Sequence, residues 1–369
     1  MSWTEIRSQF PALRHWTFLN TASFGQIPIR AKAALDRHFA RRDEFACHDF
    51  IEWFDDMDEI RGLAARLIHC AASDIAFIPN ASTALSLLIG GLDWKSGDRI
   101  VTLQDEFPNH YYYPAHLRHA GVEFVETPFE RFYDAIAPRT RLVALSSVNY
   151  TTGFRPPLEE ISRFLRERDV LFYVDGTQSV GALECDVEKI RPDLLAVHGY
   201  KWLLSPNGAG FLYASPALRE RLEPAVIGWR SDRNWRGVDR LHHGRPAFSN
   251  DAEKYEGGML PFAILYAMGE SIRMILDIGP ERIERRALAL AAEAAAILQQ
   301  AGGKVRHRDS PIVAADFGER DVSALARALE RERVLVAARH GNLRVSPHFY
   351  NDEADLARLA EALRRFGDN

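Results

Sequence analysis

The stretches VLFYVDGTQSVG (residues 170–181) and LLAVHGYKWLL (residues 194–204) each begin as an apolar run and end in polar residues. Such runs are typical of strands that are covered on both faces of a parallel sheet. Asp175 ends the first run. Lys201 follows the second run and lies one crossover unit further along the chain. Because ligands collect at the carboxyl edge of a parallel sheet, the sequence predicts that both side chains face a ligand there.

Five further β-rich runs alternate with helical stretches around these two. They are AFIP, RIVTLQ, VEFVET, RLVALSSV and GFLYAS, and together the seven runs occupy about residues 74–214. The alternation predicts βαβ units. We therefore expect an α/β fold with a central, mainly parallel sheet of seven strands sandwiched by helices.

The chain changes character after this region. Residues 228–258 are rich in Gly, Arg, Trp and Asn, which predicts a long irregular connection. A helical stretch from about 261 to 300 then leads into a smaller α+β unit. Its last helix is indicated by Leu356, Leu359 and Leu363, at helical spacing behind the capping candidate Asp352.

Length and composition limit the function classes. A chain of 369 residues exceeds the usual size of one domain, so a large domain with a smaller companion is expected. The net charge is -5 and Lys and Arg are scattered, which argues against a nucleic-acid partner. The N-terminal MSWTEIRSQF has no basic segment followed by an apolar run, and no apolar stretch approaches the roughly 18 residues of a membrane span.

The cysteines indicate the compartment. Cys47, Cys70 and Cys185 are far apart and odd in number, and none belongs to a C-x-x-C pair. This pattern favours neither a zinc site nor a redox dithiol. We expect no bound metal, reduced thiols and a cytoplasmic location.

Asp175 and Lys201 together indicate a chemistry that neither residue indicates alone. An Asp at a strand end is often only a turn former or a helix cap, and a lone lysine often extends from a loop into solvent. Together, a carboxylate for a pyridinium nitrogen and an amine for a Schiff base are what pyridoxal phosphate chemistry needs. The aromatic and apolar neighbours of Lys201 favour its neutral, nucleophilic form.

The stretch IPNASTALSLLIGG predicts a phosphate cradle. It combines a strand end with Ser82 and Thr83 at the start of an apolar helix that stops at Gly90. Free amides and the positive end of a helix dipole form an anion site. Simple N-capping by Asn80 and its neighbours is the alternative interpretation.

The motifs as a set resemble the class V aminotransferases, which are pyridoxal 5′-phosphate enzymes of fold type I. The resemblance covers nearly the whole chain, through FLNTASFGQIP, NASTAL, DEFPNH, SSVNYTTGFRPPLEEI, YVDGTQSVG, HGYKWLL, YEGGMLPF and LRVSPHFYN. It implies an N-terminal segment bordering the active site (1–30), a large cofactor-binding domain (31–258) and a small C-terminal domain (259–369). It also implies a homodimer with active sites at the subunit interface.

The resemblance assigns cofactor roles to individual residues. Lys201 would form the internal aldimine, Asp175 would hold the ring nitrogen, and Gln178 would bond the ring 3-hydroxyl. Phe107 resembles the aromatic that stacks on the ring in kynureninase, although an ordinary core Phe is the alternative. The implied phosphate contacts are Ser82, Thr83, His198, Tyr200 and, from a neighbouring subunit, Trp229.

The resemblance also implies a substrate side of the site. Arg344 matches the arginine that binds the substrate α-carboxylate, a role that suits its planar fork. Asn20 and Tyr150 are the further substrate-binding candidates. Outside its motif, Arg344 would be interpreted as a surface arginine.

Two departures from the family pattern bear on the reaction. Gly258, Met259 and Leu260 stand where many relatives have Gly-Thr before Pro, so a hydroxyl contact to phosphate from the partner subunit is not expected. No cysteine follows Cys185, which disfavours the persulfide mechanism of cysteine desulfurases.

The resemblance implies an enzyme that acts at Cα or Cβ of a small α-amino acid, through an external aldimine and a quinonoid. An aminotransferase, epimerase or carbon–sulfur lyase reaction fits, and Lys201 would be the general base. A kynureninase-like hydrolase is the named alternative. A non-catalytic binding protein is the alternative from another class, against which the joint presence of Lys201, Asp175 and Arg344 argues.

Overall fold

A seven-stranded sheet forms the centre of the molecule in the computed structural model, which describes residues 2–241 and 243–366. Its spatial order is β2-β8-β7-β6-β5-β3-β4. The strands are β2 (Ile75–Ile78), β3 (Arg99–Leu103), β4 (Glu123–Thr127), β5 (Thr140–Ser146), β6 (Leu171–Asp175), β7 (Leu194–His198) and β8 (Gly210–Ala214). All seven strands expected from the sequence are present, and the α/β fold is confirmed.

One strand breaks the parallel pattern. Strand β8 pairs antiparallel with both β2 and β7, whereas the pairs from β7 through β4 are parallel. Since β2 and β7 therefore run in the same direction, their carboxyl ends lie at the same edge. The segments that follow β2, β6 and β7 meet there.

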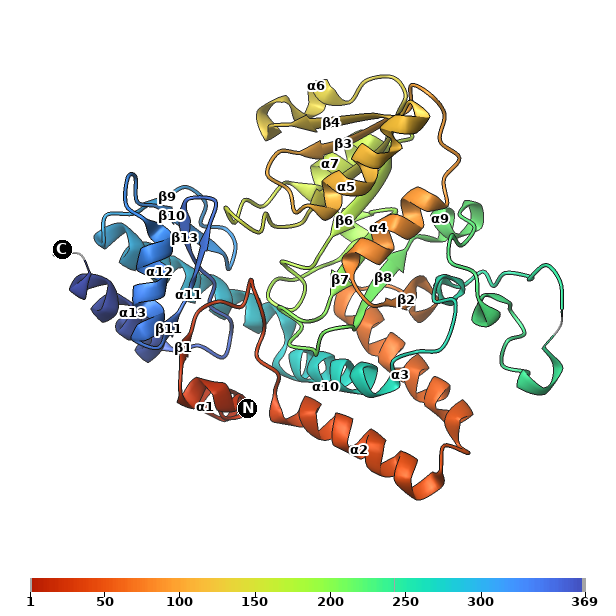
Figure 1. Cartoon of the computed structure of the whole chain (residues 1–369), viewed down its shortest axis with the longest axis horizontal. Coiled ribbons are helices and arrows are strands. Elements are labelled where there is room, and N and C mark those ends of the chain that lie inside the picture. The colour runs from red at the N-terminus through yellow and green to blue at the C-terminus, as the bar shows by residue number, and fades with distance from the viewer. Residues whose placement is uncertain (1, 242, 367–369) are drawn as a thin grey trace.

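Helices cover both faces of the sheet, as Figure 1 shows. On one face, α4 (Ala81–Gly90) and α9 (Pro216–Arg221) pack on alternate strand residues such as Ala76, Ile100 and Leu142, with α5 (Asn109–His116) alongside. On the other face lie α3 (Phe50–Ile68), α7 (Leu158–Arg166) and α10 (Phe262–Ile278). Two buried layers result, so the strands are apolar on both sides.

The C-terminal unit lies to one side of the large sheet (Figure 1). Its four-stranded antiparallel sheet has the order β12-β13-β10-β9. The strands are β9 (Lys304–Val305), β10 (Val313–Asp316), β12 (Ala337–Arg339) and β13 (Asn342–Val345), and the helices are α11 (Pro280–Gln300), α12 (Val322–Arg331) and α13 (Glu353–Arg365). Asp352 caps α13 as expected, by accepting from the amide of Asp355.

The helical stretch expected from 261 to 300 is two helices. Gly279, at φ 96°, separates α10 from α11, and Pro280 begins the second helix. Glycine tolerates this positive φ and proline suits a first helical turn. Helix α10 packs on the large sheet and α11 on the small one; the domain boundary at 258/259 stays a prediction.

The connection between α9 and α10 is irregular, as expected. It contains only the 3-10 turns η5 (Trp229–Ser231), η6 (Val238–Arg240) and η7 (Ala252–Tyr255) among its described residues. Glu256, whose side chain is fully buried, holds the connection to α3 through an ion pair with Arg61 (2.6 Å) and pairs within the connection with Arg230 (2.7 Å). It also accepts from the amide of Phe77 at 2.8 Å, on the edge strand β2.

The remaining elements are short or N-terminal. They are α1 (Trp3–Ser8), α2 (Ile29–Phe45), α6 (Phe132–Ala135), α8 (Val187–Ile190), β1 (Thr17–Phe18), β11 (Val334–Leu335) and the 3-10 turns η1 (Pro11–Arg14), η2 (Ala72–Asp74), η3 (Leu117–Ala120) and η4 (Phe129–Arg131). Strand β1 pairs with β11, which joins the N-terminal segment to the C-terminal unit. Within the described residues, no helix has the length and apolar character that crossing a membrane requires.

Candidate active site

Asp175 and Lys201 belong to adjacent strands of the large sheet. Asp175 ends β6, which pairs with β7, and Lys201 follows three residues after the end of β7. Both side chains are buried, each with 7% of its surface exposed. Asp175 Oδ1 accepts the amide of Thr177 at 2.8 Å, and the described residues give Oδ2 no hydrogen bond. Oδ2 is therefore left for a donor on a bound group.

The amine of Lys201 is unusually easy to deprotonate. Burial lowers its pKa to about 8, because a charged ammonium loses its hydration in this setting. Asp175 opposes this shift, whereas the nearby Arg344 and Arg339 add to it. A substantial neutral fraction near pH 8 is what a nucleophilic or basic lysine requires.

His198 and Tyr200 lie beside this pair. Their ring centroids are 4.3 Å apart, and the Tyr200 ring lies 5.3 Å from Lys201 Nζ. Burial lowers the pKa of His198 to about 4, so its imidazole is neutral at physiological pH. His198 Nε2 is buried without a hydrogen-bond partner among the described residues. An uncharged ring nitrogen is thus available to a ligand.

The start of α4 offers a possible cradle at the same edge. Asn80 caps the helix by accepting from the amide and the hydroxyl of Thr83, at 2.9 and 3.1 Å. The capping interpretation of this motif therefore holds for Asn80 and Thr83. Ser82 is exposed in the first turn. The free amides and the dipole of this turn can still bind an anion.

Gln178 and Phe107 each lie close to the lysine turn. Gln178 is buried, donates to Ala22 O at 3.1 Å and accepts from Trp202 Nε1 at 2.8 Å. Its amide is thereby fixed in orientation, with one N–H left to donate. Phe107 is 38% exposed, and its ring centroid is 5.7 Å from Lys201 Nζ. That half-open ring has a free surface for a planar group.

Arg344, on strand β13 of the C-terminal unit, is almost fully buried. It is 1% exposed, donates to Tyr150 O at 2.6 Å and approaches Asn20 Oδ1 at 3.4 Å. Burial lowers its pKa to about 9, with a further contribution from Arg339. None of the ion pairs within residues 2–241 and 243–366 gives it a carboxylate, and its Nε has no partner there. A buried guanidinium in this state is well suited to an incoming carboxylate.

The N-terminal segment packs over the lysine turn. The amide of Gly25 donates to Tyr200 O at 2.9 Å. A Cβ at Gly25 would lie 1.9 Å from Lys201 O, so only glycine fits this approach. Ser23 accepts from Arg344 at 2.7 Å. The segment FLNTASFGQIP was expected from the sequence to border the site, but neither Ser23 nor Gly25 within it was predicted as a site residue.

Arg339 is the other residue that sequence analysis missed. It lies on β12 across a two-residue hairpin from the strand of Arg344, and its Nη2 is 3.4 Å from Ser23 Oγ. The available signal was the His-Gly pair at 340–341, a turn that brings flanking residues together. Nothing in the local sequence relates Arg339 to Lys201.

Trp229 has no hydrogen bond or ring contact with the other candidates among the described residues. It packs edge-on against Phe54 and Trp235, with centroids 6.1 and 5.4 Å away. Its assignment was to a neighbouring subunit, so it stays a prediction. Met259, 62% exposed, lies near the start of α10.

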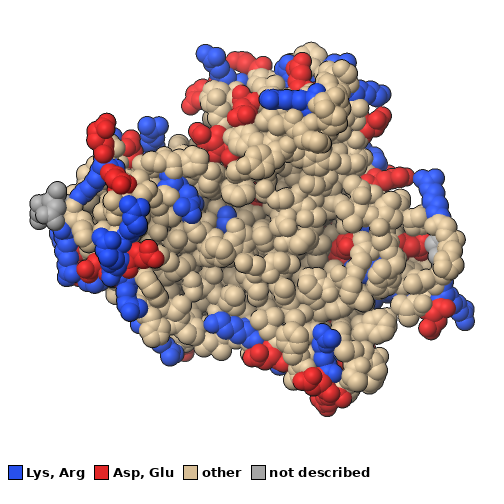
Figure 2. All heavy atoms as spheres, viewed as in Figure 1, with Lys and Arg blue, Asp and Glu red and all other residues tan. Residues whose placement is uncertain are grey.

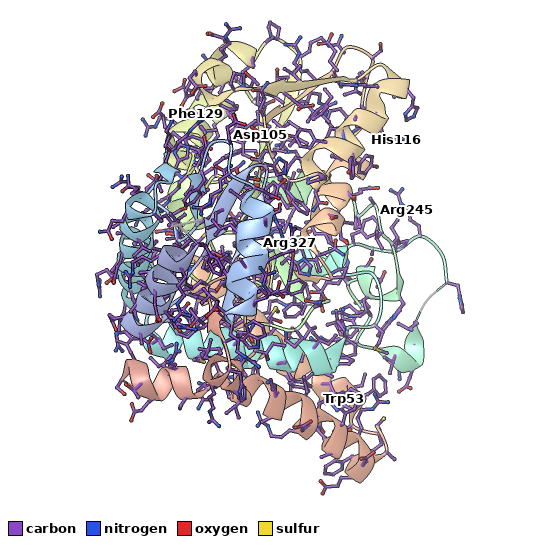
Figure 3. The ribbon with its side chains drawn as sticks, turned by 60° about the vertical axis from the view of Figure 1, so that its left-hand side comes forward. Trp53, Asp105, His116, Phe129, Arg245 and Arg327 are labelled. Atoms are coloured by element: carbon purple, nitrogen blue, oxygen red, sulfur yellow. The ribbon has the colours of Figure 1, made fainter. Side chains whose placement is uncertain are left out.

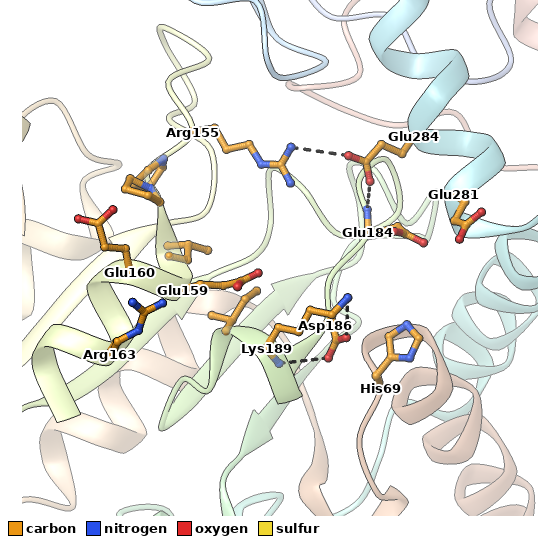
Figure 4. Close-up of a pocket in the computed structure, with 14 residues that line it drawn as sticks. His69, Arg155, Glu159, Glu160, Arg163, Glu184, Asp186, Lys189, Glu281 and Glu284 are labelled. Carbon is orange, nitrogen blue, oxygen red and sulfur yellow. Dashed lines mark hydrogen bonds and ion pairs between the residues drawn. The ribbon is translucent and has the colours of Figure 1, made fainter. Parts of the chain in front are cut away.

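A groove of about 680 Å³ elsewhere on the molecule contains none of the candidate residues (Figure 4). It lies between α7, α8 and α11, where Glu284 accepts the amide of Glu184 at 2.7 Å and pairs with Arg155 at 3.6 Å. Its lining is mixed in charge. Among the described residues no group of three or more His, Cys, Asp or Glu side chains is arranged to hold a metal ion.

The family model for aminotransferase class V matches residues 44–359. The chain belongs to the class V aminotransferase family, whose members use pyridoxal 5′-phosphate.

Two curated relatives illustrate the breadth of this family. A probable cysteine desulfurase of Methanothermobacter thermautotrophicus is 26% identical over 97% of this chain and 96% of its own. The isopenicillin N epimerase of Streptomyces clavuligerus is 29% identical over 98% of this chain and 97% of its own. The two names describe different reactions, so similarity alone leaves the reaction open.

Solved structures show the same fold. The cystine C–S lyase C-DES, in complex with its product cysteine persulfide, has a TM-score of 0.88 at 23% identity and covers 98% of this chain and 99% of its own. The cysteine desulfurase CsdA of Escherichia coli has a TM-score of 0.86 at 21% identity, with coverage of 99% and 98%. The expected fold type is confirmed.

The residues present fit the family's cofactor. Three groups lie at one edge of the sheet. Within the described residues, they are the Nε2 of His198, which has no partner, the Oδ2 of Asp175, which has no hydrogen bond, and the buried amine of Lys201. They would hold a phosphate group, a ring nitrogen and an aldehyde carbon, respectively. These are the three attachments that pyridoxal phosphate needs.

Proposed function

We propose that the protein acts at Cα or Cβ of a small α-amino acid, in an epimerase, carbon–sulfur lyase or aminotransferase type of reaction. The observation that carries the proposal is the buried amine of Lys201, with its pKa lowered to about 8, beside the carboxylate of Asp175. Arg344 supports it, because a buried guanidinium without an acidic partner is suited to an α-carboxylate.

Each residue has a definite task in this proposal. The cofactor, when bound, supplies an electron sink for the charge that develops at Cα. Asp175 keeps a proton on the ring nitrogen, which maintains that sink. Arg344 fixes the substrate by its carboxylate. Lys201 would hold the cofactor and, as a neutral amine, would be the base that takes up the Cα proton.

A persulfide on the protein is not part of the proposal. Several relatives are named probable cysteine desulfurases, but no cysteine follows Cys185 here. Burial raises the pKa values of Cys70 and Cys185 to about 12, which keeps both thiols protonated. A carbon–sulfur lyase would have to release its sulfur product directly.

A kynureninase-like hydrolase is the second candidate. Phe107, whose ring faces the region of Lys201 Nζ, is the observation that favours it. A substrate panel separates the reactions: alanine and anthranilate from kynurenine indicate the hydrolase, and pyruvate or sulfide from cysteine conjugates indicates a lyase. Conversion of the cofactor to its amine form by amino donors indicates a transaminase.

The first test is the colour of the purified protein. We expect a visible absorption band from the cofactor bound to Lys201, and its loss in Lys201→Ala. Lys304→Ala, which removes an exposed lysine from β9, is the matched control and should keep the band. A Lys201→Ala protein that retains the wild-type band would contradict the proposed attachment.

We also propose a homodimer that completes the active sites. An apolar groove of about 680 Å³ is lined by residues of α2, α3 and the start of α10, including Phe39, Trp53 and Met259. Phe39 and Met259 are 52% and 62% exposed. On the face drawn in Figure 2, the Lys, Arg, Asp and Glu side chains gather mainly toward the outline of the molecule. Apolar patches of this kind commonly mark interfaces between subunits.

The oligomeric state tests this second proposal. Light scattering after gel filtration should give twice the chain mass for the wild type, and Met259→Glu should shift the protein toward the monomer. Ile29→Glu changes an exposed apolar residue that does not line the groove and serves as the control. A fully active monomer would rule out a site shared between subunits.

A further inference from the structure

Two guanidinium groups converge on one hydroxyl oxygen at the substrate side of the candidate active site. Ser23 Oγ accepts from Arg344 Nη2 at 2.7 Å and from Arg339 Nη2 at 3.4 Å. Like charges this close repel each other. An anion placed between or beside them would relieve the repulsion.

No acidic side chain in residues 2–241 and 243–366 supplies that anion. Within the part of the chain that the structure describes, neither arginine forms an ion pair, and Arg344 Nε is buried without any partner. Asp175, the carboxylate at the floor of the site, raises the pKa of Lys201. Once the cofactor occupies Asp175 and a substrate α-carboxylate occupies Arg344, the charge of Arg339 is still uncompensated.

The hairpin geometry places Arg339 farther out on the same face. Ala337 pairs with Arg344 and Arg339 pairs with Asn342, so the two arginines are diagonal neighbours in an antiparallel pair. Such residues project from one face with Cα atoms about 7–8 Å apart. Leu343 and Val345, fully buried, point to the opposite face. Arg344 therefore lies inside and Arg339 at the rim.

The turn next to Arg339 is tied to the large-sheet side. His340 and Gly341 have φ values of 46° and 78°, as a two-residue turn of type I′ requires. His340 Nε2 is hydrogen-bonded to Tyr150 Oη at 2.9 Å, which fixes the tip of the hairpin to the large-sheet side. Tyr150 in turn packs edge-on against Phe107.

We infer that Arg339 forms a second anion subsite and that the substrate is an α-amino acid whose side chain carries an acidic group. The inference rests on the proposed function, which assigns Arg344 to the α-carboxylate. The buried fork of Arg344 takes the α-carboxylate, and the rim guanidinium of Arg339 takes the anion at the end of the side chain. The main competing geometry has both arginines on the same carboxylate.

Calorimetric titration of the holoenzyme with glutarate and with butyrate separates these geometries. Butyrate is glutarate with one carboxylate replaced by hydrogen, so both probes have the same three-carbon alkyl chain and only glutarate has a second anion. We expect glutarate to bind the wild type at least tenfold more tightly. Arg339→Gln should weaken the binding of glutarate about five- to tenfold, as for one part-exposed charged contact. It should leave the affinity for butyrate within twofold of the wild-type value.

Two further variants complete the design. Arg344→Gln should weaken both probes. Arg327→Gln removes an arginine from α12, on the far side of the small sheet, where its side chain is 63% exposed (Figure 3). It should change neither affinity, which controls for the loss of one positive charge in the same unit.

The outcomes distinguish this inference from the function it rests on. Equal affinity of the wild type for the two probes, or an equal loss of both in Arg339→Gln, would overturn the second subsite. A protein without the cofactor band would instead refute the proposed function. Calorimetry measures the heat of binding and not that band, so the same titration of the protein as purified, with or without cofactor, decides the subsite.

Discussion

Lys201 shows how one residue takes its chemistry from its neighbours. The side chain is buried and feels the charges of one carboxylate and two guanidinium groups, and burial is the largest of these influences on its pKa. An ordinary lysine, with a pKa near 10.4, is almost entirely charged at pH 8. A pKa of about 8 makes roughly half of the amines neutral at that pH.

The rate of cofactor capture should follow this pKa. Only the neutral amine attacks an aldehyde, so capture by the apoprotein should accelerate as pH rises and level off above about pH 8. Stopped-flow absorption between pH 6.5 and 9.5 measures the capture rate. Lysine acetylated on its α-amine, with its side-chain amine free, is the reference. A rate that keeps rising through pH 9.5, parallel to free lysine, would show that Lys201 is not perturbed.

Residue identities were predictable from the sequence where they belong to contiguous motifs. Asp175, His198, Tyr200 and Lys201 follow apolar strands, and the structure brings them together. Arg339 was not predictable, because its importance arises from a shared contact with a serine that is 316 positions away in the chain. Local sequence carries no record of such a contact.

At the scale of elements, the strands were easier to predict than their directions or the helix ends. Apolar runs located all seven strands, but antiparallel β8 depends on a short connection after Lys201 that periodicity does not describe. The helical stretch expected from about 261 to 300 contains a break that the apolar pattern did not indicate, because Gly279 interrupts the pattern by only one residue. Gly279 and Pro280 together were the overlooked signal.

The contact between the N-terminal segment and the lysine turn makes Gly25→Ala a sharp test. An alanine Cβ would lie 1.9 Å from Lys201 O, so the segment or the turn must move. We expect a loss of about 2–4 kcal/mol of unfolding free energy, in the range of overpacking and backbone strain, and weaker cofactor binding. Urea unfolding and cofactor titration measure these changes.

Gly62→Ala provides the matched control for this prediction. Gly62 lies within α3, where an added Cβ meets no atom within 4 Å. Alanine favours a helix interior, so this variant should equal or slightly exceed the wild type in stability. Equal behaviour of the two alanine variants would mean that the segment does not rest on the lysine turn.

For the whole molecule, a buried histidine sets a lower pH limit on stability. Burial lowers the pKa of His348 to about 3, whereas an unfolded histidine titrates near 6.5. The unfolded chain therefore binds one more proton between these values, so stability falls as pH drops below about 6.5. At pH 5 the titration of this residue alone should lower the free energy of unfolding by about 2 kcal/mol.

Urea midpoints from pH 4 to 8 for the wild type and His348→Gln check this contribution. The variant lacks the titrating ring, so its stability should fall less between pH 7 and pH 5 than that of the wild type. His15→Gln changes a histidine that is exposed and should keep the wild-type slope. Parallel curves for His348→Gln and the wild type would assign the acid sensitivity to other groups.

The placement of the three free thiols makes the molecule convenient for spectroscopy. Cys70 and Cys185 have pKa values raised to about 12 by burial, so maleimide dyes react with them slowly at neutral pH. Cys47 is less buried than Cys185 and lines the apolar groove beside Met259. A fluorophore attached there would sit at the proposed meeting point of two chains, and its emission would report their association in real time.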